Sequence, residues 1–395
     1  MKRLFAILVF CAAGLFATGA SAQQMTPITN WFRVTPDTLL LWQITEVEAN
    51  HLKIELKANS TAKRRRIAVI YPRLSSAYDI AISTILETFQ QADQNIELDV
   101  RNFRNDDTLA AAVLKASLEA KPDLILAMGS EAVDYVFDNY KAGTIPVVTV
   151  CAKDPVSLGQ MPNYEVGSGT NYAFTSLNMP VEVQLAYLLD VKPNLKNISI
   201  LVDSRNTSAI ETQERPIAEA ARRKGLTIID GLVTDPTKAK EELRALMPRA
   251  VREMRRTDPE LRNSVFIVTG STAVFREIET IASLAGRAPV ISLIPEVVQE
   301  GEASAALSIG ISFESNARLA ASYALQVLET PSRVGQLKVG IVSPPDISIN
   351  FLITRKIGLR VPFTLLEAAS FVYDGDGQMV RARGQLVRRR SDKTG

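Results

Sequence analysis

The sequence predicts an α/β protein with two doubly wound parallel-sheet lobes joined by hinge crossings. Three observations lead to this fold class. From Ile67 onward, short β-branched runs alternate with longer stretches of helical periodicity, which is the pattern of parallel strands joined by crossover helices. The alternation breaks between Ala152 and Pro180 and then resumes. A chain of 395 residues, 46% hydrophobic and 22% charged, is also long enough to form two cores.

The β-branched runs mark the expected strands, which are 67–72, 96–103, 123–129, 146–151, 198–203, 226–233, 264–270 and 289–294. Helical periodicity is clear at 79–91 and at 108–120, and Asp107 is in position to cap the second of these helices. Residues 152–180 are rich in Gly, Pro, Asn and Ser and have no helical period. This stretch is therefore expected to cross irregularly between the two lobes.

The first 22 residues have the parts of a secretory signal peptide. Lys2 and Arg3 precede an apolar stretch, and small side chains at Ala20–Ala22 end it, so cleavage is expected after Ala22. The apolar stretch is shorter than the roughly 20 residues of a spanning helix, which argues against a retained membrane anchor. The next residues, 23–62, do not show the alternation of β-branched runs and helical stretches, and they could form an added hairpin or an amphipathic arm.

The charge balance argues against nucleic acid as a partner. The chain has 45 basic residues, so removal of Lys2 and Arg3 leaves 43 against 43 acidic residues. A neutral chain lacks the basic surface that nucleic-acid binding needs. Two basic stretches, Lys63–Arg66 and Arg381–Lys393, flank the expected body. We expect them to be solvated ends; contact with an acidic partner or a membrane surface is the alternative.

The residues that most catalytic and metal sites need are nearly absent. His51 is the only histidine, and Cys151 is the only cysteine after the predicted signal peptide. A His-based catalytic site or a nitrogen-and-sulfur metal site is therefore not expected. No Gly-rich stretch has the spacing of a nucleotide-binding loop. We predict no enzyme activity, no metal and no cofactor, and carboxylate chemistry is the alternative left open.

One strand-to-helix corner occurs twice. LILAMGSEAV turns at Ser130, and FIVTGSTAVF turns at Ser271. In such a corner glycine permits a tight turn, serine can cap the new helix, and the first helical amides stay unpaired. Open α/β sheets bind ligands at the carboxyl ends of their strands. The repeat therefore predicts two matching corners, one in each lobe, that face each other across a cleft and hold the two sides of one ligand.

Three further segments carry a family likeness: IPVVTVCAKDPVSLGQM (145–161), NMPVEVQLAYLLDVKPNLKNISILVD (178–203) and PPDISINFLITRKIGLRVPFTLLEAASFVYD (344–374). Together they resemble the secreted substrate-binding proteins of ABC importers, in the type I family that includes tryptophan- and tyrosine-binding members. The likeness runs from about Ile67 to Asp374. It implies a type I periplasmic binding protein-like fold whose lobes close on a small solute and perform no chemistry.

The resemblance also implies ranges for the two lobes, which are 66–172 and 306–335 for lobe one and 173–305 and 336–374 for lobe two. The predicted signal peptide (1–22), an N-terminal extension (23–65) and a basic tail (375–395) lie outside the resemblance. The ligand is expected where strands of both lobes end. The predicted ligand-binding residues are Ser75, Ser76, Ser130, Glu131, Asp154, Asp203, Ser208, Thr269, Ser271, Ile294 and Ser308.

The resulting prediction is a periplasmic solute-binding component of an ABC importer that delivers a small polar ligand, such as an amino acid or related carboxylate, to a membrane permease. A periplasmic ligand-sensing module that signals to a membrane receptor or kinase is the alternative. If the ligand is an amino acid, its ammonium group is expected nearer Glu131, because only the first corner offers a carboxylate.

Overall fold

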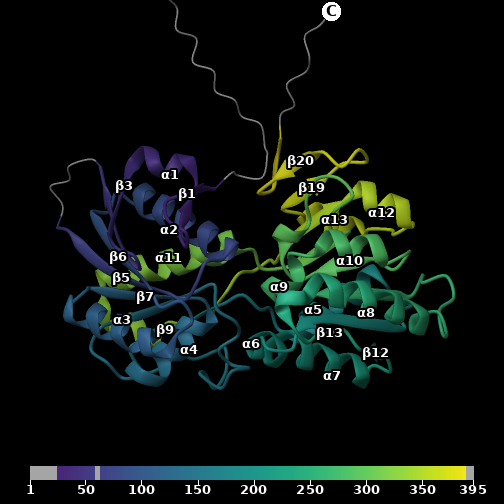
Figure 1. The fold of residues 1–395 in the computed structure, drawn as a ribbon, viewed down its shortest axis with the longest axis horizontal. Coiled ribbons are helices and arrows are strands. Elements are labelled where there is room, and N and C mark those ends of the chain that lie inside the picture. The colour runs from purple at the N-terminus through teal and green to yellow at the C-terminus, as the bar shows by residue number, and fades with distance from the viewer. Residues whose placement is uncertain (1–24, 58–62, 388–395) are drawn as a thin grey trace, which may run out of the picture.

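A computed structural model describes residues 25–57 and 63–387 of the chain. The predicted signal peptide lies outside the described residues. The described chain forms two lobes, left and right in Figure 1, each built on one main sheet. Helix α11 (Phe313–Glu329), drawn in green, lies in the left lobe among elements from the first half of the chain. The predicted α/β fold class is confirmed.

Lobe one contains a seven-stranded sheet in the order β3-β4-β6-β5-β7-β8-β9. The strands are β3 (Trp42–Glu48), β4 (His51–Leu56), β5 (Arg65–Tyr71), β6 (Ile96–Asn102), β7 (Leu124–Met128), β8 (Val147–Val150) and β9 (Tyr172–Ala173). The central strands are parallel and buried on both faces because their runs are apolar throughout. Ile67 and Val69 of β5 face the cluster of α2 (Ser76–Gln91) and α11, and Ala68 and Ile70 face that of α3 (Asp107–Glu119) and α4 (Gly129–Tyr140).

The start of α3 corrects one detail of the sequence analysis. Asp106, not Asp107, is the capping residue, and its side chain accepts a hydrogen bond from Leu109 N at 2.8 Å. Asp107 is the first residue of the helix. Its carboxylate still lies in the first turn, where it interacts favourably with the helix dipole.

The N-terminal segment forms a hairpin, which was one of the two predicted alternatives. Strands β3 and β4 pair antiparallel, and β4 pairs antiparallel with β6, so the hairpin extends the sheet of lobe one. It follows β1 (Thr26–Pro27), β2 (Arg33–Val34) and α1 (Pro36–Leu41). Trp31 packs against Tyr71 with ring centroids 5.6 Å apart, and His51 is buried with Nε2 2.8 Å from Asp99 Oδ2. His51 is therefore a satisfied structural residue.

Lobe two contains a ten-stranded sheet in the order β12-β11-β14-β15-β16-β18-β19-β20-β21, with β13 also paired to β11. The strands are β11 (Asn197–Asp203), β12 (Thr227–Ile229), β13 (Leu232–Val233), β14 (Ser264–Val268), β15 (Val290–Ser292), β16 (Leu307–Gly310), β18 (Asp346–Asn350), β19 (Phe371–Tyr373), β20 (Met379–Ala382) and β21 (Gln385–Leu386). The run predicted as one strand at 226–233 thus forms two short strands, β12 and β13, that both pair with β11.

Helices cover both faces of this second sheet. The α-helices are α5 (Val181–Val191), α6 (Thr207–Ala209), α7 (Arg215–Arg223), α8 (Ala239–Met254), α9 (Thr272–Phe275), α10 (Ile278–Leu284), α12 (Phe351–Ile357) and α13 (Phe363–Ala368). Val265 and Ile267 of β14 face the cluster of α5 and α7, whereas Phe266 and Val268 face that of α8 and α10. Shorter turns are the π-helix η1 (Ile210–Glu214) and the 3₁₀ turns η2 (Pro236–Lys238), η3 (Pro295–Val297) and η4 (Pro331–Gln336).

Two of the implied range boundaries differ from the structure. Strand β16 pairs with β15 and β18 in the sheet of lobe two, although 306–335 was expected in lobe one. The return to lobe one therefore comes at Ile311–Ser312, just before α11. Within the expected basic tail, β20 and β21 continue the sheet of lobe two as antiparallel strands, so 379–386 is not a solvated end. Residues 388–395 of that tail lie outside the described residues.

The crossings between the lobes are tied together by buried polar groups. Strand β10 (Thr175–Ser176) on one crossing pairs with β17 (Gly340–Ile341) on another. Asn316 of α11 is fully buried beside them; its Oδ1 accepts from Cys151 N at 2.8 Å and its Nδ2 donates to Ser176 O at 3.0 Å. This single side chain therefore joins lobe one to the first crossing.

Carboxylates of lobe two hold the beginning of α11. Asp346 Oδ2 accepts from Ser312 N at 2.9 Å, and Glu296 Oε1 accepts from Phe313 N at 2.8 Å. The first amides of a helix lack partners within it and carry partial positive charge, so both contacts are favourable. The junction between the lobes is thus built from side-chain caps as well as from main-chain crossings.

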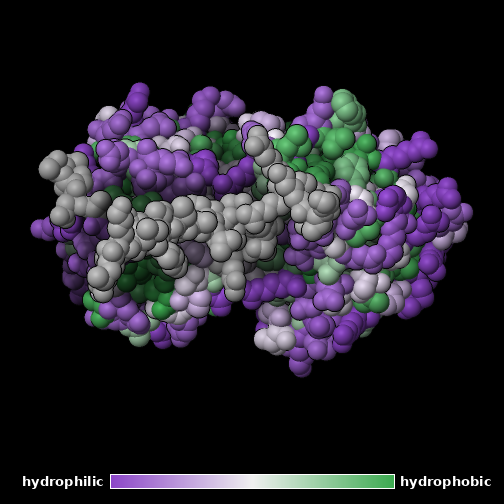
Figure 2. All heavy atoms as spheres, turned by 90° about the horizontal axis from the view of Figure 1, so that it is seen from above, coloured by the Kyte–Doolittle hydropathy of each residue, from purple (hydrophilic) through white to green (hydrophobic). Residues whose placement is uncertain are grey.

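The upper surface of the molecule has hydrophobic areas. Figure 2 shows them mainly over lobe two, where Figure 1 places α12, α13, β19 and β20. Phe363 and Leu386 of this region are 69% and 78% exposed. None of the described helices is long and apolar enough to cross a membrane.

Candidate functional site

A cleft of about 790 Å³ lies between the two lobes, where strands of both sheets end. Lobe one contributes residues that follow β5 and β7, and lobe two contributes the start of α6, the turn η2 and helix α9. Helix α4 of lobe one and helix α6 of lobe two, whose residues line the cleft, are labelled in Figure 1. This is the edge at which open α/β sheets bind ligands. The fold therefore places a candidate site where the repeated corners predicted one.

The cleft carries charges of both signs. Its basic residues are Arg73, Arg205, Lys240 and Arg276, and its acidic residues are Glu131, Asp134, Asp203, Glu241 and Glu277. Such a lining suits a small ligand that itself carries both charges, because each ionic group finds an opposite partner.

Glu131 lies at the start of α4 and is already engaged. Its Oε1 accepts from Arg73 Nη2 at 3.0 Å and from Arg73 Nε at 3.2 Å, while Tyr78 donates to Oε2 at 3.1 Å. Gly129 has a φ of +82°, and the Tyr78 side chain occupies the space where its Cβ would be. The glycine therefore lets Tyr78 reach Glu131. A ligand ammonium near Glu131, as predicted, would have to compete with Arg73.

Lys153 lies at the inner end of the cleft, in a narrow pocket of about 40 Å³ that it shares with Ser130 and Gly270. The side chain is buried, and among the described residues its ammonium group has no hydrogen-bond or ion-pair partner. Burial lowers the pKa of Lys153 to about 8, although Glu131 and Cys151 act in the opposite direction. The group is still mostly charged at pH 7. A Cβ on Gly270 of lobe two would collide with Nζ, so Lys153 reaches across the lobes.

The second corner differs from its prediction. Ser271 is fully buried, and its Oγ accepts from Asp203 N at 3.3 Å. Thr269 is buried as well and donates to Leu201 O at 2.9 Å. Both side chains brace neighbouring strands and do not line the cleft. Helix α9 after this corner has only four residues, so it is no counterpart of α4. Ser271 therefore does not face Ser130 as expected.

Two other predicted residues lie away from the cleft. Asp154 is buried and organises its own loop, accepting from Val156 N at 2.9 Å, from Ser157 Oγ at 2.9 Å and from the hydroxyl of Tyr164. Ser308 is buried within the sheet and accepts from Ser348 N at 3.2 Å. Asp154 follows strand β8, as expected, whereas Ser308 lies within strand β16. In both residues the side chain already accepts hydrogen bonds from other protein groups.

The structure does bring most of the remaining predicted residues together. Those that line the cleft or its inner pocket are Ser75, Ser130, Glu131, Asp203 and Ser208. Ser76 and Ile294 instead line an adjoining apolar pocket of about 520 Å³. Residues that the sequence analysis missed include Arg73, Asn206 and Arg276. Arg73 comes two residues after a buried strand, which is the signal that could have found it.

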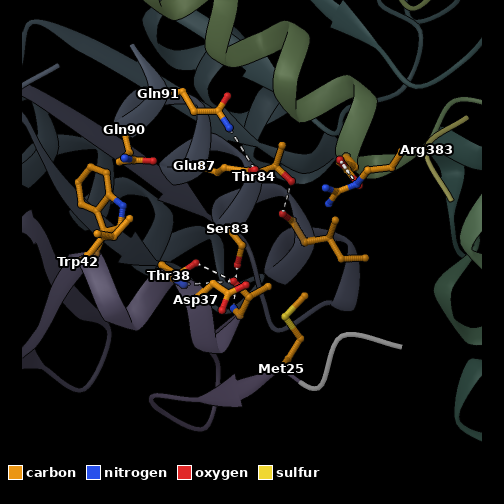
Figure 3. A pocket seen from close by; sticks show the side chains of 14 residues that line it. Met25, Asp37, Thr38, Trp42, Ser83, Thr84, Glu87, Gln90, Gln91 and Arg383 are labelled. Atoms are coloured by element: carbon orange, nitrogen blue, oxygen red, sulfur yellow. Dashed lines mark hydrogen bonds and ion pairs between the residues drawn. The ribbon is translucent and has the colours of Figure 1, made fainter. Parts of the chain in front are cut away.

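A separate pocket of about 300 Å³ lies outside the cleft, between the N-terminal extension and α2 (Figure 3). Its polar groups are occupied by one another. Ser83 Oγ accepts from Thr35 N at 3.1 Å and donates to Asp79 O at 3.0 Å, and Gln91 donates to Glu87 at 3.2 Å. The interlobe cleft is therefore the stronger candidate for a ligand. No group of three or more His, Cys, Asp and Glu residues in the described chain could hold a metal ion.

The chain belongs to the ABC transporter substrate binding protein family, whose model matches residues 66–372. A search of curated proteins found no match. Among solved structures, a conserved domain protein from Vibrio cholerae has a TM-score of 0.61 at 19% identity, over 78% of this chain and 100% of that one. An ABC domain from Streptococcus pneumoniae in complex with L-Trp has a TM-score of 0.60 at 17% identity, with the same coverage.

A third structure is a ligand-free, open substrate-binding protein with adhesive properties from Clostridium difficile. It has a TM-score of 0.56 at 20% identity, over 75% of this chain and 96% of that one. These likenesses establish the type I periplasmic binding fold. The family and the fold are those of binding proteins rather than enzymes.

Proposed function

We propose that this chain is the periplasmic solute-binding component of an ABC importer and that its lobes close on a small ligand with a carboxylate group, such as an amino acid. The family supports the class of protein, and the predicted signal peptide supports the location. The observation that carries the ligand proposal is the unpartnered ammonium group of Lys153 at the inner end of the cleft.

Among the described residues the Lys153 ammonium group has no hydrogen-bond or ion-pair partner, and it lines the inner pocket, so a carboxylate that enters the pocket could pair with it. A carboxylate at Lys153 would gain a charge-assisted hydrogen bond in a site with little water. Lys153 comes from lobe one and lies against Gly270 of lobe two, so a ligand bound there would contact both lobes. Contacts that form only when the lobes approach each other favour the closed state.

The test is calorimetry of the mature chain at pH 7 against the L-amino acids and simple carboxylates, each paired with its amide. We expect at least one carboxylate to bind and its amide to bind at least tenfold more weakly. Lys153→Met should abolish binding, whereas Lys115→Met, on the exposed surface of α3 away from the cleft, should change affinity less than threefold. Absence of binding across the panel, or an amide that binds as well as its acid, would contradict the proposal.

A sensing role is the second candidate. The hairpin of β3 and β4 lies outside the family match at 66–372 and gives lobe one a surface of its own. Uptake of labelled ligand separates the two roles. An importer component requires the chain for uptake, whereas a sensor leaves uptake intact and its loss silences a receptor response.

A further inference from the structure

We propose that the ligand is an amphipathic carboxylate, and that its apolar body occupies the apolar pocket beside the cleft, which we call the apolar chamber. This inference rests on the proposed function for the position of the carboxylate at Lys153. The chamber has a volume of about 520 Å³, and twelve of the eighteen residues that line it are apolar, among them Met25, Ile80, Phe275, Ile278, Phe371 and Met379. Pockets of this size ordinarily hold small organic ligands.

The chamber adjoins the carboxylate position. Phe275 of lobe two and Phe313 of α11 line both the pocket around Lys153 and the chamber. A molecule whose carboxylate reaches Lys153 therefore has an apolar wall next to it that leads into the chamber. The chamber is walled by both lobes: Ile80 lies on α2, and Ile278 begins α10. An apolar body in this position would contact both lobes, as the carboxylate does.

The charges around the chamber are compatible with an anionic ligand. Glu314 is neutralised by Arg318 at 3.0 Å and by Arg383 at 2.9 Å. Glu296 accepts from Phe313 N, and burial raises its pKa to about 8, so it is mostly uncharged at pH 7. Arg276 also lines the chamber, and among the described residues it has no ion-pair partner. The chamber therefore does not repel an anion and offers no partner to a ligand cation.

Part of the chamber wall lies outside the residues that the family model matches. Met25, Tyr373 and Met379 line the chamber and lie outside the family match at 66–372. The C-terminal strands are held in place by the ion pair from Arg383 to Glu314 of α11. Segments at both ends of the described chain thus close one end of the space between the lobes. These segments limit the length of the apolar part of a ligand that the chamber can hold.

The test uses straight-chain carboxylates from butanoate to dodecanoate, titrated by calorimetry at pH 7 below their micelle concentrations. Each methylene that enters the chamber should raise affinity about fourfold. Affinity should stop rising when the chamber is full. Met379→Trp, which fills part of the chamber, should move that limit to a shorter chain. Leu40→Trp, on the exposed surface of α1, is the matched control and should leave the whole series unchanged.

The outcomes separate the two proposals. If amino acids or short carboxylates bind through Lys153 but affinity is independent of chain length, the chamber inference is overturned and the proposed function stands. A length dependence that Met379→Trp does not alter would reflect non-specific adsorption and would also overturn the inference. If no carboxylate of any kind binds, both proposals fail.

Discussion

Replacing Glu296 with glutamine should change how the stability of the protein depends on pH. Glu296 lies on η3, and its Oε1 accepts from Phe313 N at the start of α11. Its Oε2 is buried without a hydrogen-bond partner among the described residues. Burial is the main cause that raises the pKa of Glu296 to about 8, and the nearby Asp346 and Glu314 add to the effect. Glutamine keeps the carbonyl oxygen that accepts from Phe313 but cannot ionise.

The sign and size of the effect follow from the two pKa values. An ordinary glutamate ionises near pH 4.5, so between about pH 4.5 and 8 the folded state holds this proton more tightly than the unfolded state. The contribution is fully present below pH 4.5 and is lost as pH rises towards 8. Each unit of difference corresponds to about 1.4 kcal/mol, so from pH 5 to pH 8 the loss is about 3 to 4 kcal/mol.

The assay is urea unfolding of the wild type and of Glu296→Gln at four pH values from 5 to 8. The variant should lose about 3 to 4 kcal/mol less of its unfolding free energy over that range, and it should be the more stable protein at pH 8. Glu302→Gln, which removes only an exposed ion pair with Lys356, is the control and should run parallel to the wild type. Parallel curves for Glu296→Gln and the wild type would refute the reasoning.

Three other predictions concern the crossings, the first corner and the cleft. Asn316→Ala should destabilise the protein by about 2 to 4 kcal/mol in urea unfolding, because it leaves Cys151 N and Ser176 O buried without partners; a loss under 1 kcal/mol would contradict this. Gly129→Ala should cost at least about 1 to 2 kcal/mol in the same assay, because φ is +82° and Tyr78 fills the Cβ position, and an unchanged midpoint would count against it. Carboxylate affinity, measured by calorimetry, should be constant below pH 7 and should fall up to tenfold per pH unit above about 8 as Lys153 loses its proton; a flat profile to pH 10 would exclude Lys153 as the anion partner.

The sequence predicted the fold well because its signals are local. Runs such as IAVI in β5 and LILAM in β7 are apolar at every position, which only a strand buried on both faces requires. The hinge boundaries were harder. Strand β16 belongs to lobe two because it pairs with β15 and β18. Its four residues, LSIG, do not by themselves indicate which strands they pair with. The same holds for β20 and β21, whose charged residues resembled a solvated tail.

The residues of the candidate site, like the hinge boundaries, could be predicted only in part from local sequence. Ser130 and Ser271 occupy equivalent places in two similar pentamers, yet only Ser130 lines the cleft. Both hydroxyl groups accept a main-chain N–H, from Lys153 at 3.1 Å for Ser130 and from Asp203 at 3.3 Å for Ser271, but Ser271 is fully buried whereas Ser130 keeps some exposed surface. Asp154 was predicted to bind ligand and is instead saturated by its own loop. Position after a strand identifies which residues reach the cleft edge, but the number of protein partners decides which remain available.

The position of Cys151 gives the protein a built-in reporter. It is the one cysteine of the described residues, it lines the inner pocket beside Lys153, and its main-chain amide is held by Asn316 at the crossings. Burial raises the pKa of the Cys151 thiol far above its usual range, so the native fold protects it from alkylation. The rate at which a thiol reagent labels the native protein therefore measures how often the inner pocket opens, without any engineered probe. A true ligand would slow that labelling in proportion to its occupancy.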